Sequence, residues 1–464
     1  MSEIEGKEFM QIINPFNNEV IDTVPDSTPE DVYAAISKAV AAKPRIANLT
    51  AYRRGQILNL AAALIETHAD DIAYTMALES GKPMRYAKGE VSRAVETFAF
   101  ASDEARRLHG ETIPLDAAKS GAGKIGYYIR ESIGVIAAIT PFNFPLNLVA
   151  HKVAPAIAAG CPIVLKPAPA TPLTTLKLAD ILREAGLPDG ALQVVIGGAD
   201  VGNALVSDPR ISMISFTGSP PVAREISKVA GLRRTAFELG GNAATIIDEY
   251  TDPLAALNSN IIGGFAYSGQ VCISVQRIYI HESHFETFKD AFVERANKLK
   301  AGDPLQESTE IGPMINESAA ARVEAWVNEA AEQGADVIAG GKRQGKVVQP
   351  TVIINAKPSM KVMSEEIFGP VVCLIPFSDF DDAIAQVNDS PYGLQAGVYT
   401  DNLHRAMQAI RTLNVGGVMI NDVPTFRVDH MPYGGNKDSG VGREGPRFAV
   451  EEMTTLKMVV LNTK

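Results

Sequence analysis

Two side chains in this sequence have the chemistry for covalent catalysis, Cys272 and Glu238. Cys272 follows a Gly-Gln turn that could leave its thiol accessible to a substrate, although a lone cysteine is more commonly a small buried hydrophobe. We interpret Cys161 and Cys373 in that second way, because both lie inside apolar runs. Glu238 lies between two apolar residues, before a Gly-Gly turn. Partial burial there would raise the pKa of its carboxyl towards that of a general base.

Polar or glycine-rich segments follow five short apolar runs. The runs are 134–140, 161–166, 192–196, 211–216 and 234–237, and the segments that end them are 141–145, 166–167, 197–198, 217–219 and 238–241. One such segment is more commonly a turn or a helix cap. Because ligands bind at the carboxyl ends of the strands in open α/β sheets, five in succession predict one binding crevice.

The segment Gly440–Gly445 matches the dinucleotide fingerprint GxGxxG. It follows no predicted strand and lies in no βαβ unit, so we expect a loop there. Gly218 and Ser219 form the better phosphate site, because they open a helix whose free N-terminal amides can meet an anion.

The helices and strands that carry these residues can be recognised from the spacing of apolar residues, and their order predicts an α/β fold with two doubly wound domains. Helical spacing of apolar residues marks 31–42, 51–73, 86–108 and 173–185, and a second strand series lies near 275–281, 348–353, 371–376, 394–399 and 416–420. Near-continuous apolar strands alternating with helices indicate parallel sheets covered on both faces. Residues 124–131 and 456–461 also resemble strands, and they form either an arm for a second subunit or an edge hairpin.

Length and composition exclude several classes of protein. The 464 residues predict two or three domains, and the net charge of -11 argues against a nucleic-acid surface. The N-terminus lacks the features of a signal peptide, and no uncharged apolar stretch is long enough to cross a membrane. Three widely spaced cysteines without a CxxC motif argue against a disulfide framework and a structural zinc site. We expect a cytoplasmic protein.

Seven motifs in this order resemble those of the aldehyde dehydrogenase superfamily. They are Pro-Phe-Asn-Phe-Pro at 141–145, Lys-Pro at 166–167, Phe-Thr-Gly-Ser at 216–219, Glu-Leu-Gly-Gly at 238–241, Gly-Gln-Val-Cys at 269–272, Glu-Ile-Phe-Gly-Pro at 366–370 and Pro-Tyr-Gly-Gly at 432–435. The resemblance implies that Cys272 is the nucleophile that forms a thioester. It implies that Asn143 is the oxyanion-hole amide and that Glu238 is the base that activates water.

The resemblance also implies a nicotinamide cofactor, NAD or NADP, and no metal. The cofactor-binding residues it implies are Thr140, Pro141, Phe142, Lys166, Gly198, Phe216, Gly218, Ser219, Leu239, Glu366 and Phe368. Many NAD-preferring relatives carry a glutamate three residues after the lysine, where it would repel a 2′-phosphate. Here that residue is Pro169, so the sequence is compatible with either cofactor.

The substrate site resembles those of the lactaldehyde dehydrogenase and non-phosphorylating glyceraldehyde-3-phosphate dehydrogenase branches. Arg107 and Arg427 match two of three anion-binding arginines in the latter, and Val271 stands at the third position. The substrate residues implied are Arg107, Phe144, Val271, Ile273, Arg427 and Tyr433. We therefore expect a short anionic or 2-hydroxylated aldehyde of the lactaldehyde, sulfolactaldehyde or semialdehyde type. The alternative is that both arginines are structural.

Two other functions are open at this point. One is a dehydrogenase that passes the acyl group to coenzyme A, a branch that usually lacks Glu238, and the other is a non-catalytic binding or structural protein. The domains implied are a Rossmann-like NAD(P)-binding domain (1–115 and 133–239), a catalytic domain (240–430) and an oligomerisation arm (116–132 and 446–464). We expect a homodimer or homotetramer, with no nucleic-acid or membrane partner.

Overall fold

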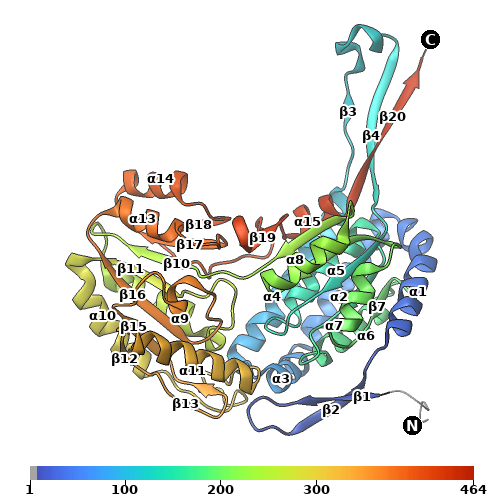
Figure 1. The fold of residues 1–464 in the computed structure, drawn as a ribbon. Helices are drawn as coiled ribbons and strands as arrows, with labels where there is room; N and C mark the ends of the chain where they lie inside the picture. Colours follow the sequence, from blue (N-terminus) through green and yellow to red (C-terminus); the bar gives the residue numbers. More distant parts are fainter. Residues whose placement is uncertain (1–7, 464) are drawn as a thin grey trace.

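Residues 8–463 are described by a computed structural model, and they form two α/β lobes and a projecting arm (Figure 1). Residues 1–7 and 464, which fall in the predicted domain ranges, lie outside the described residues. Among the described residues, no helix is both long and apolar enough to cross a membrane.

The first lobe contains a six-stranded sheet in the order β19-β9-β8-β5-β6-β7. Its strands are β5 (Val135–Ile139), β6 (Ile163–Lys166), β7 (Leu192–Val194), β8 (Ile211–Thr217), β9 (Arg234–Glu238) and β19 (Gly440–Val441). Alternate residues of β5 belong to two separate cores, one on each face of the sheet. That double burial explains the continuous apolar runs in the sequence. β19 pairs antiparallel with β9, so the segment predicted as a loop begins with a short edge strand.

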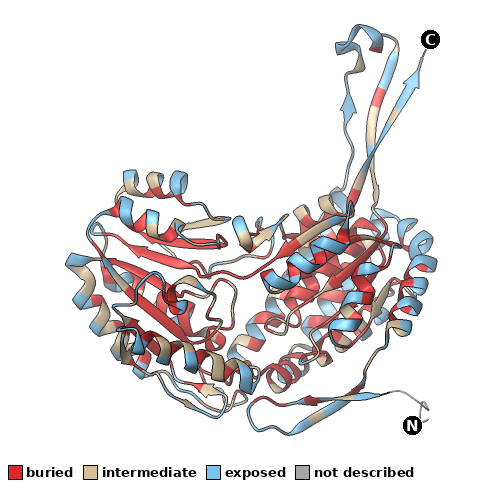
Figure 2. Cartoon of the chain, in the orientation of Figure 1, coloured by how far each residue is buried: buried red, intermediate tan, exposed pale blue. Residues whose placement is uncertain are grey.

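Helices cover both faces of this sheet (Figure 2). One face carries α1 (Pro29–Ala47), α7 (Ala199–Ser207) and α8 (Pro220–Ala230), and the other carries α2 (Ala51–Thr67), α3 (Ala69–Ser80), α4 (Met84–Arg107), α5 (Asn147–Ala159) and α6 (Leu173–Glu184). The single helix predicted over 51–73 is divided at His68, whose backbone leaves the helical region (φ −100°, ψ 18°). α4 begins at the boundary between the two lobes, where Met84 N–H donates to Pro304 O, and it runs towards the arm (Figure 1).

The second lobe contains a seven-stranded sheet in the order β12-β15-β16-β11-β10-β17-β18, parallel except for β12. Its strands are β10 (Ala244–Ile247), β11 (Arg277–His281), β12 (Asp336–Ala339), β15 (Thr351–Ile354), β16 (Val371–Phe377), β17 (Gln395–Tyr399) and β18 (Gly417–Ile420). Its main helices are α9 (Leu257–Phe265), α10 (Glu282–Asn297), α11 (Glu317–Glu332), α13 (Phe380–Asn388) and α14 (Leu403–Thr412). The predicted α/β class with two such domains is confirmed; the sequence analysis missed β10 and β12.

The arm is an antiparallel sheet of β3 (Thr112–Ile113), β4 (Lys124–Ser132) and β20 (Thr454–Asn462). It differs from the predicted arm at both boundaries. β3 precedes residue 116, and α15 (Pro446–Glu452) packs on α5 and α4 because it buries Ala449 and Val450 in the first-lobe core. Most of the arm is exposed (Figure 2). Its exposed large apolar residues include Ile125, Leu456 and Val460.

Candidate active site

Cys272 follows an unusual turn at the end of α9. Tyr267, Ser268 and Gly269 all have positive φ (50°, 55° and 68°), a conformation that costs free energy in residues other than glycine. The side chains anchor the turn: Tyr267 Oη donates to Ser80 O at 3.0 Å, and Ser268 Oγ donates to Gly312 O at 2.7 Å. A Cβ on Gly269 would lie 2.1 Å from Gly369 O, so only glycine fits there. The turn therefore presents the thiol from a rigid backbone.

Two cavities meet at Cys272. The first, which we call the crevice, has a volume of about 230 Å³ and lies along the carboxyl ends of the first-lobe strands. The second, which we call the arginine pocket, has a volume of about 320 Å³ and extends towards α4 and the Arg427 loop. Cys272 and Leu148 line both. The thiol is thus placed where two ligands could react with each other.

Asn143 lies beside the turn that carries Cys272. It is buried, and its Nδ2 donates to Gln270 O at 3.0 Å. The Cys272 N–H donates to no acceptor in the part of the chain that the structure describes. The Asn143 amide and this backbone N–H are the two donors that the predicted oxyanion hole requires.

Glu238 ends β9 and lines neither cavity. Its side chain is buried, and Oε2 has no hydrogen-bond partner. Burial and the neighbouring Glu444 raise the pKa of Glu238 well above its usual range, against the opposing effect of Arg427, Lys152 and Arg443. A Cβ on Gly434 would lie 2.8 Å from Glu238 Oε1, so the Pro-Tyr-Gly-Gly segment passes directly over the carboxylate. The Glu238 carboxyl therefore binds a proton more strongly than an exposed glutamate does, as a general base must.

The crevice has the features of a dinucleotide site. Seven of the predicted cofactor residues line it, Pro141, Phe142, Gly218, Ser219, Leu239, Glu366 and Phe368. Ser219 caps α8, but the first two residues of this helix are Pro220 and Pro221, which carry no N–H, so most of the free first-turn amides expected from the sequence are absent. Thr217 at the end of β8 has a buried hydroxyl without a partner. A Cβ on Gly240 would lie 2.1 Å from Glu366 Oε2, so glycine keeps the crevice open beside that carboxylate.

The remaining predicted cofactor residues do not line the crevice. Thr140 follows β5, and its hydroxyl is buried without a partner. Lys166 ends β6 and is 7% exposed; burial lowers its pKa, against the opposing effect of Asp200 and Asp26. Gly198 caps α7. Phe216 belongs to the core, where its ring lies under Gly218 and so shapes the crevice from below.

Glu366 and Phe368 close the crevice from the second lobe. Glu366 Oε1 accepts a hydrogen bond from Gly241 N at 3.0 Å, and burial raises the pKa of this carboxyl to about 7. Phe368 has φ 47°, and its ring meets Phe142 edge-on at 5.9 Å between centroids. Residues from both lobes therefore converge on the crevice to which the sequence assigns the cofactor.

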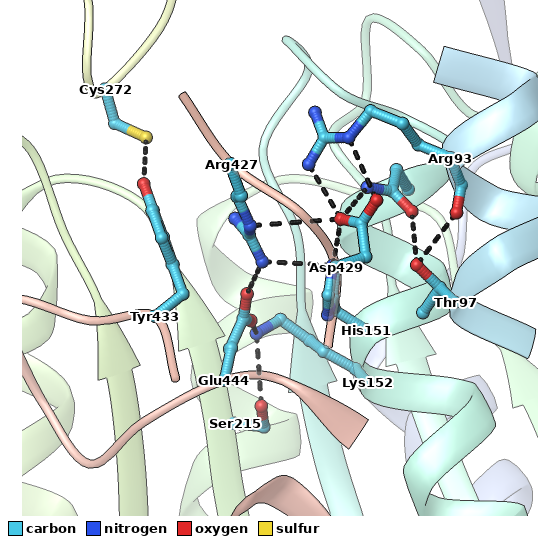
Figure 3. A network of polar contacts seen from close by, with 11 residues as sticks. Arg93, Thr97, His151, Lys152, Ser215, Cys272, Arg427, Asp429, Tyr433 and Glu444 are labelled. Atoms are coloured by element: carbon cyan, nitrogen blue, oxygen red, sulfur yellow. Dashed lines mark hydrogen bonds and ion pairs between the residues drawn. The ribbon is translucent and has the colours of Figure 1, made fainter. Parts of the chain in front are cut away.

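A network of charges lines the arginine pocket and continues behind it (Figure 3). Asp429 accepts from Arg93 Nε and Nη2 at 3.0 and 2.7 Å, and it lies 2.8 Å from His151 Nε2. Arg427 Nη2 donates to Glu444 Oε2 at 3.2 Å, and Lys152 Nζ donates to Glu444 Oε1 at 3.1 Å. The network connects the substrate side of Cys272 to the surroundings of Glu238.

The pKa values of this network follow from burial and from the opposing charges. Burial acts to raise the pKa of Glu444, but Lys152, His151 and Arg427 outweigh it and bring the pKa to about 2. Burial and Arg427 lower the pKa of His151. Glu444 is thus ionised at neutral pH.

The structure places Arg427, Phe144, Val271, Ile273 and Tyr433 on the arginine pocket, but not Arg107. The Arg107 side chain is 67% exposed, and it pairs with Asp103 and Glu104 near the arm. The cations that α4 contributes to the pocket are Arg85 and Arg93 instead. Arg107 lies 14 residues beyond Arg93 along the helix, which is a separation of about 21 Å. The prediction that Arg107 contacts the substrate is therefore corrected.

Lys82 and Glu90 are further residues that the sequence analysis missed. Lys82 is 1% exposed on the pocket wall, and its ammonium pairs with Glu90 and lies over the Phe144 ring at 3.9 Å. Glu90 Oε1 accepts from the N–H groups of Leu146 and Asn147 at 2.9 and 3.0 Å, so it fixes the start of α5 after the Asn143 loop. The available signal was a polar stripe, Glu90, Arg93 and Thr97, on an otherwise apolar helix face.

Among residues 8–463, no group of three or more His, Cys, Asp or Glu side chains could hold a metal ion. All three cysteines are free, and Cys161 and Cys373 are buried as predicted.

Comparison with known proteins agrees with this geometry. The sequence model of the aldehyde dehydrogenase family matches residues 2–459. A 3-sulfolactaldehyde dehydrogenase of Priestia aryabhattai is 44% identical over 457 residues, which cover 98% of this chain and 95% of that protein.

Two solved structures superpose over nearly the whole chain. The aldehyde dehydrogenase 21 of Physcomitrella patens, in complex with the reaction product succinate, has a TM-score of 0.97 at 42% identity, covering 99% of this chain and 96% of that one. A glyceraldehyde-3-phosphate dehydrogenase of Methanocaldococcus jannaschii, complexed with NADP, has a TM-score of 0.95 at 37% identity, covering 99% and 100%. The predicted resemblance and nicotinamide cofactor are confirmed: the chain belongs to the aldehyde dehydrogenase family and is an NAD(P)-dependent oxidoreductase.

Proposed function

We propose that this enzyme oxidises a short anionic aldehyde to the carboxylic acid through a thioester on Cys272, which water then hydrolyses. The observation that carries the proposal is the pair Arg93 and Arg427, both on the wall of the pocket that ends at Cys272. Arg93 is held by Asp429 and Arg427 by Glu444. Guanidinium groups bind carboxylate, sulfonate and phosphate through several hydrogen bonds at once.

Both arginines keep donors free for an anion. Arg93 uses Nε and Nη2 on Asp429, and Nη1 has no partner among the described residues. Arg427 Nε is buried and has no hydrogen-bond partner.

The balance of charge around the pocket favours the same substrate class. Three cations, Arg93, Arg427 and Lys152, face two carboxylates, Asp429 and Glu444, while Lys82 and Glu90 neutralise each other. Among the described residues on the pocket wall itself, the four cations Lys82, Arg85, Arg93 and Arg427 outnumber the one carboxylate, Glu90, and this excess of positive charge would attract an anionic substrate.

The relatives support a short substrate with one negative group. Those compared above act on 3-sulfolactaldehyde or glyceraldehyde-3-phosphate, or bind succinate as product. These molecules carry a sulfonate, a phosphate and a carboxylate at the end remote from the aldehyde carbon. Sulfolactaldehyde or a semialdehyde is our preferred substrate, and lactaldehyde lacks the anionic end.

The proposed chemistry assigns one step to each residue of the site. Cys272 Sγ attacks the aldehyde carbon, and the oxygen gains negative charge that Asn143 Nδ2 and the Cys272 N–H stabilise after Asn143 leaves Gln270 O. The bound NAD(P) supplies the hydride acceptor. Glu238 then takes a proton from water as the water oxygen attacks the thioester carbon. The C–S bond breaks, the acid leaves and Sγ is released as a thiolate or thiol.

The test is an assay with sulfolactaldehyde and succinate semialdehyde in the absence and presence of coenzyme A. We expect NADH or NADPH formation that does not depend on coenzyme A, with the free acid as product. In Glu238→Gln, we expect the acyl-enzyme to accumulate and to be visible in the intact mass. An absolute need for coenzyme A, with an acyl-CoA product, would contradict the proposal and favour the acyl-transferring alternative.

We also propose that the arm joins subunits into a homodimer or homotetramer. The apolar side chains that it exposes, Ile125, Ile129, Leu456, Met458 and Val460 among them, would be costly to leave in water. The mass of the purified protein, measured by light scattering during gel filtration, tests this, and a monomer would contradict it.

A further inference from the structure

Tyr433 lies against the nucleophile and not only on the wall of the substrate pocket. Its Oη is 3.0 Å from Cys272 Sγ, and the side chain is 2% exposed (Figure 3). The backbone of Tyr433 exchanges two hydrogen bonds with Glu444, with N–H to O distances of 3.1 and 2.6 Å. The phenol is therefore held in place by its own strand-like pairing rather than by a substrate.

The direction of this hydrogen bond depends on the state of the thiol. A thiolate can only accept, so once Cys272 is ionised the phenol must be the donor. Among the described residues, the phenol oxygen has no other hydrogen-bond partner, so nothing competes for its proton.

Arg427 lies over a face of the Tyr433 ring and also favours donation by the phenol. Its guanidinium carbon lies 3.6 Å from the centroid of the Tyr433 ring, and the arginine is held by Glu444. A cation on the ring face draws electron density from the phenol and makes its O–H a better donor.

The charged groups that face Cys272 would otherwise disfavour its ionised form. Burial raises the pKa of the Cys272 thiol to about 11, and Glu366 and Glu238 act in the same direction. The hydrogen bond from Tyr433 is the largest opposing influence, followed by the charge of Arg427. Without the Tyr433 hydrogen bond and the Arg427 charge, an even smaller fraction of the Cys272 thiol would be ionised at neutral pH.

We propose that Tyr433 is a catalytic residue that donates a hydrogen bond to the Cys272 thiolate, with Arg427 as the positioning residue behind it. This inference rests on the proposed role of Cys272 as nucleophile, and it adds a function to a residue that the sequence assigned to substrate contact alone. Tyr433→Phe removes only the hydroxyl and keeps the ring that packs on Arg427, so it isolates the hydrogen bond.

The experiment measures the rate of alkylation of Cys272 by iodoacetamide as a function of pH, without aldehyde or turnover. Cys161 and Cys373 are buried, and peptide mapping separates their products from that of Cys272. We expect the inflection for Tyr433→Phe to lie higher than that of the wild type by about one pH unit, with about tenfold slower alkylation at pH values below both inflections. An unchanged inflection, or a lower one, would overturn the inference.

Two controls separate the possible failures. Tyr399→Phe removes a buried hydroxyl in β17, away from both cavities, and should leave the inflection where it is. If Tyr433 contacted only the substrate, Tyr433→Phe would raise KM for the aldehyde with no change in the alkylation profile, and the inference would fail while the proposed function stood. If wild-type Cys272 were not alkylated faster than the buried cysteines, the inference about Tyr433 and the proposed role of Cys272 as nucleophile would both fail. Cofactor quenching of protein fluorescence verifies that each variant is folded.

Discussion

The crevice is lined largely by residues at strand ends, two glycines among them, whereas the arginine pocket is lined by long side chains from α4, α5 and two distant loops. In the crevice, Gly218 and Gly240 occupy positions where a Cβ would not fit. In the arginine pocket, charged side chains are held in place by other charged side chains.

This difference teaches where selectivity can change. A backbone-built crevice must be nearly the same for every substrate, because altering it means altering the sheet. A pocket built from side chains can be changed one residue at a time. We therefore expect that few substitutions in the crevice preserve cofactor binding. Substitutions in the arginine pocket should instead change which aldehyde is oxidised.

The largest expected effect lies at the point that both regions share. Cys272→Ala should lower turnover by at least about 10⁴-fold, because no other group in the site can form the thioester. Binding of NAD(P), measured by fluorescence quenching, should persist because the crevice keeps its other walls. Cys161→Ala is the matched control and should remain active. Steady-state oxidation by Cys272→Ala would sink the thioester mechanism.

A smaller loss is expected on the crevice side. Asn143→Ala should lower kcat by about 10²–10³-fold, since it removes one of two donors to the oxyanion. The pre-steady-state burst of NAD(P)H measures the steps up to and including hydride transfer, in which the oxyanion is formed. The expected outcome is a slower burst with cofactor affinity unchanged; a normal burst would show that Asn143 serves only to hold the Cys272 turn through Gln270.

Substitutions in the arginine pocket should act on substrate choice. Arg93→Met should raise KM for an anionic aldehyde about 10- to 100-fold, which is the usual worth of a hydrogen bond to a charged group. KM for a neutral aldehyde of similar length should stay within about twofold. Arg427→Met should raise KM and also lower kcat, because it stands behind Tyr433.

Arg107→Met is the control that sharpens this test, since it lies on the same helix outside the pocket. It should leave KM for every aldehyde unchanged. An effect of Arg107→Met equal to that of Arg93→Met would restore the original sequence prediction.

The smallest expected effect is a shift along the pH axis. Burial and Glu444 together hold the pKa of Glu238 above its usual range, so removing the charge of Glu444 lowers that pKa. In Glu444→Gln, hydrolysis of the acyl-enzyme should reach half its maximum about one pH unit lower than in the wild type. Quenched-flow mass spectrometry follows the acyl-enzyme directly. Glu451→Gln, on the surface, should show no shift, and a rise of the Glu444→Gln inflection would contradict the assignment.

The sequence predicted the crevice far better than the arginine pocket, for a physical reason. Residues such as Gly218 and Leu239 reach the crevice because each follows a strand of one parallel sheet, and such strand ends can be recognised locally. Arg93 and Asp429 meet across 336 positions of sequence, through α4 and a loop that has no regular pattern. α4 was predicted as a helix, but its periodicity does not show which end approaches Cys272. Arg107 was expected at the substrate only because of the family resemblance, and it lies at the end of α4 that is remote from the pocket.

The same limit applied to the elements that the sequence analysis missed. β10 is four residues long and lies in the middle of the second sheet, where tertiary packing rather than a long pattern defines it. α15 follows a glycine-rich run and buries only two or three apolar residues, so its residues appeared to extend the arm.

The most direct test of the account compares two substrates of matched size in the wild-type enzyme, succinate semialdehyde and the uncharged pentanal. Initial rates of NADH and NADPH formation give kcat/KM for each. The account predicts a preference of at least about tenfold for the anion, equal to about 1.4 kcal/mol of additional transition-state binding, and its loss in Arg93→Met. Equal values for the two aldehydes, or a preference for pentanal, would show that Arg93 and Arg427 are structural and that the pocket does not select an anion.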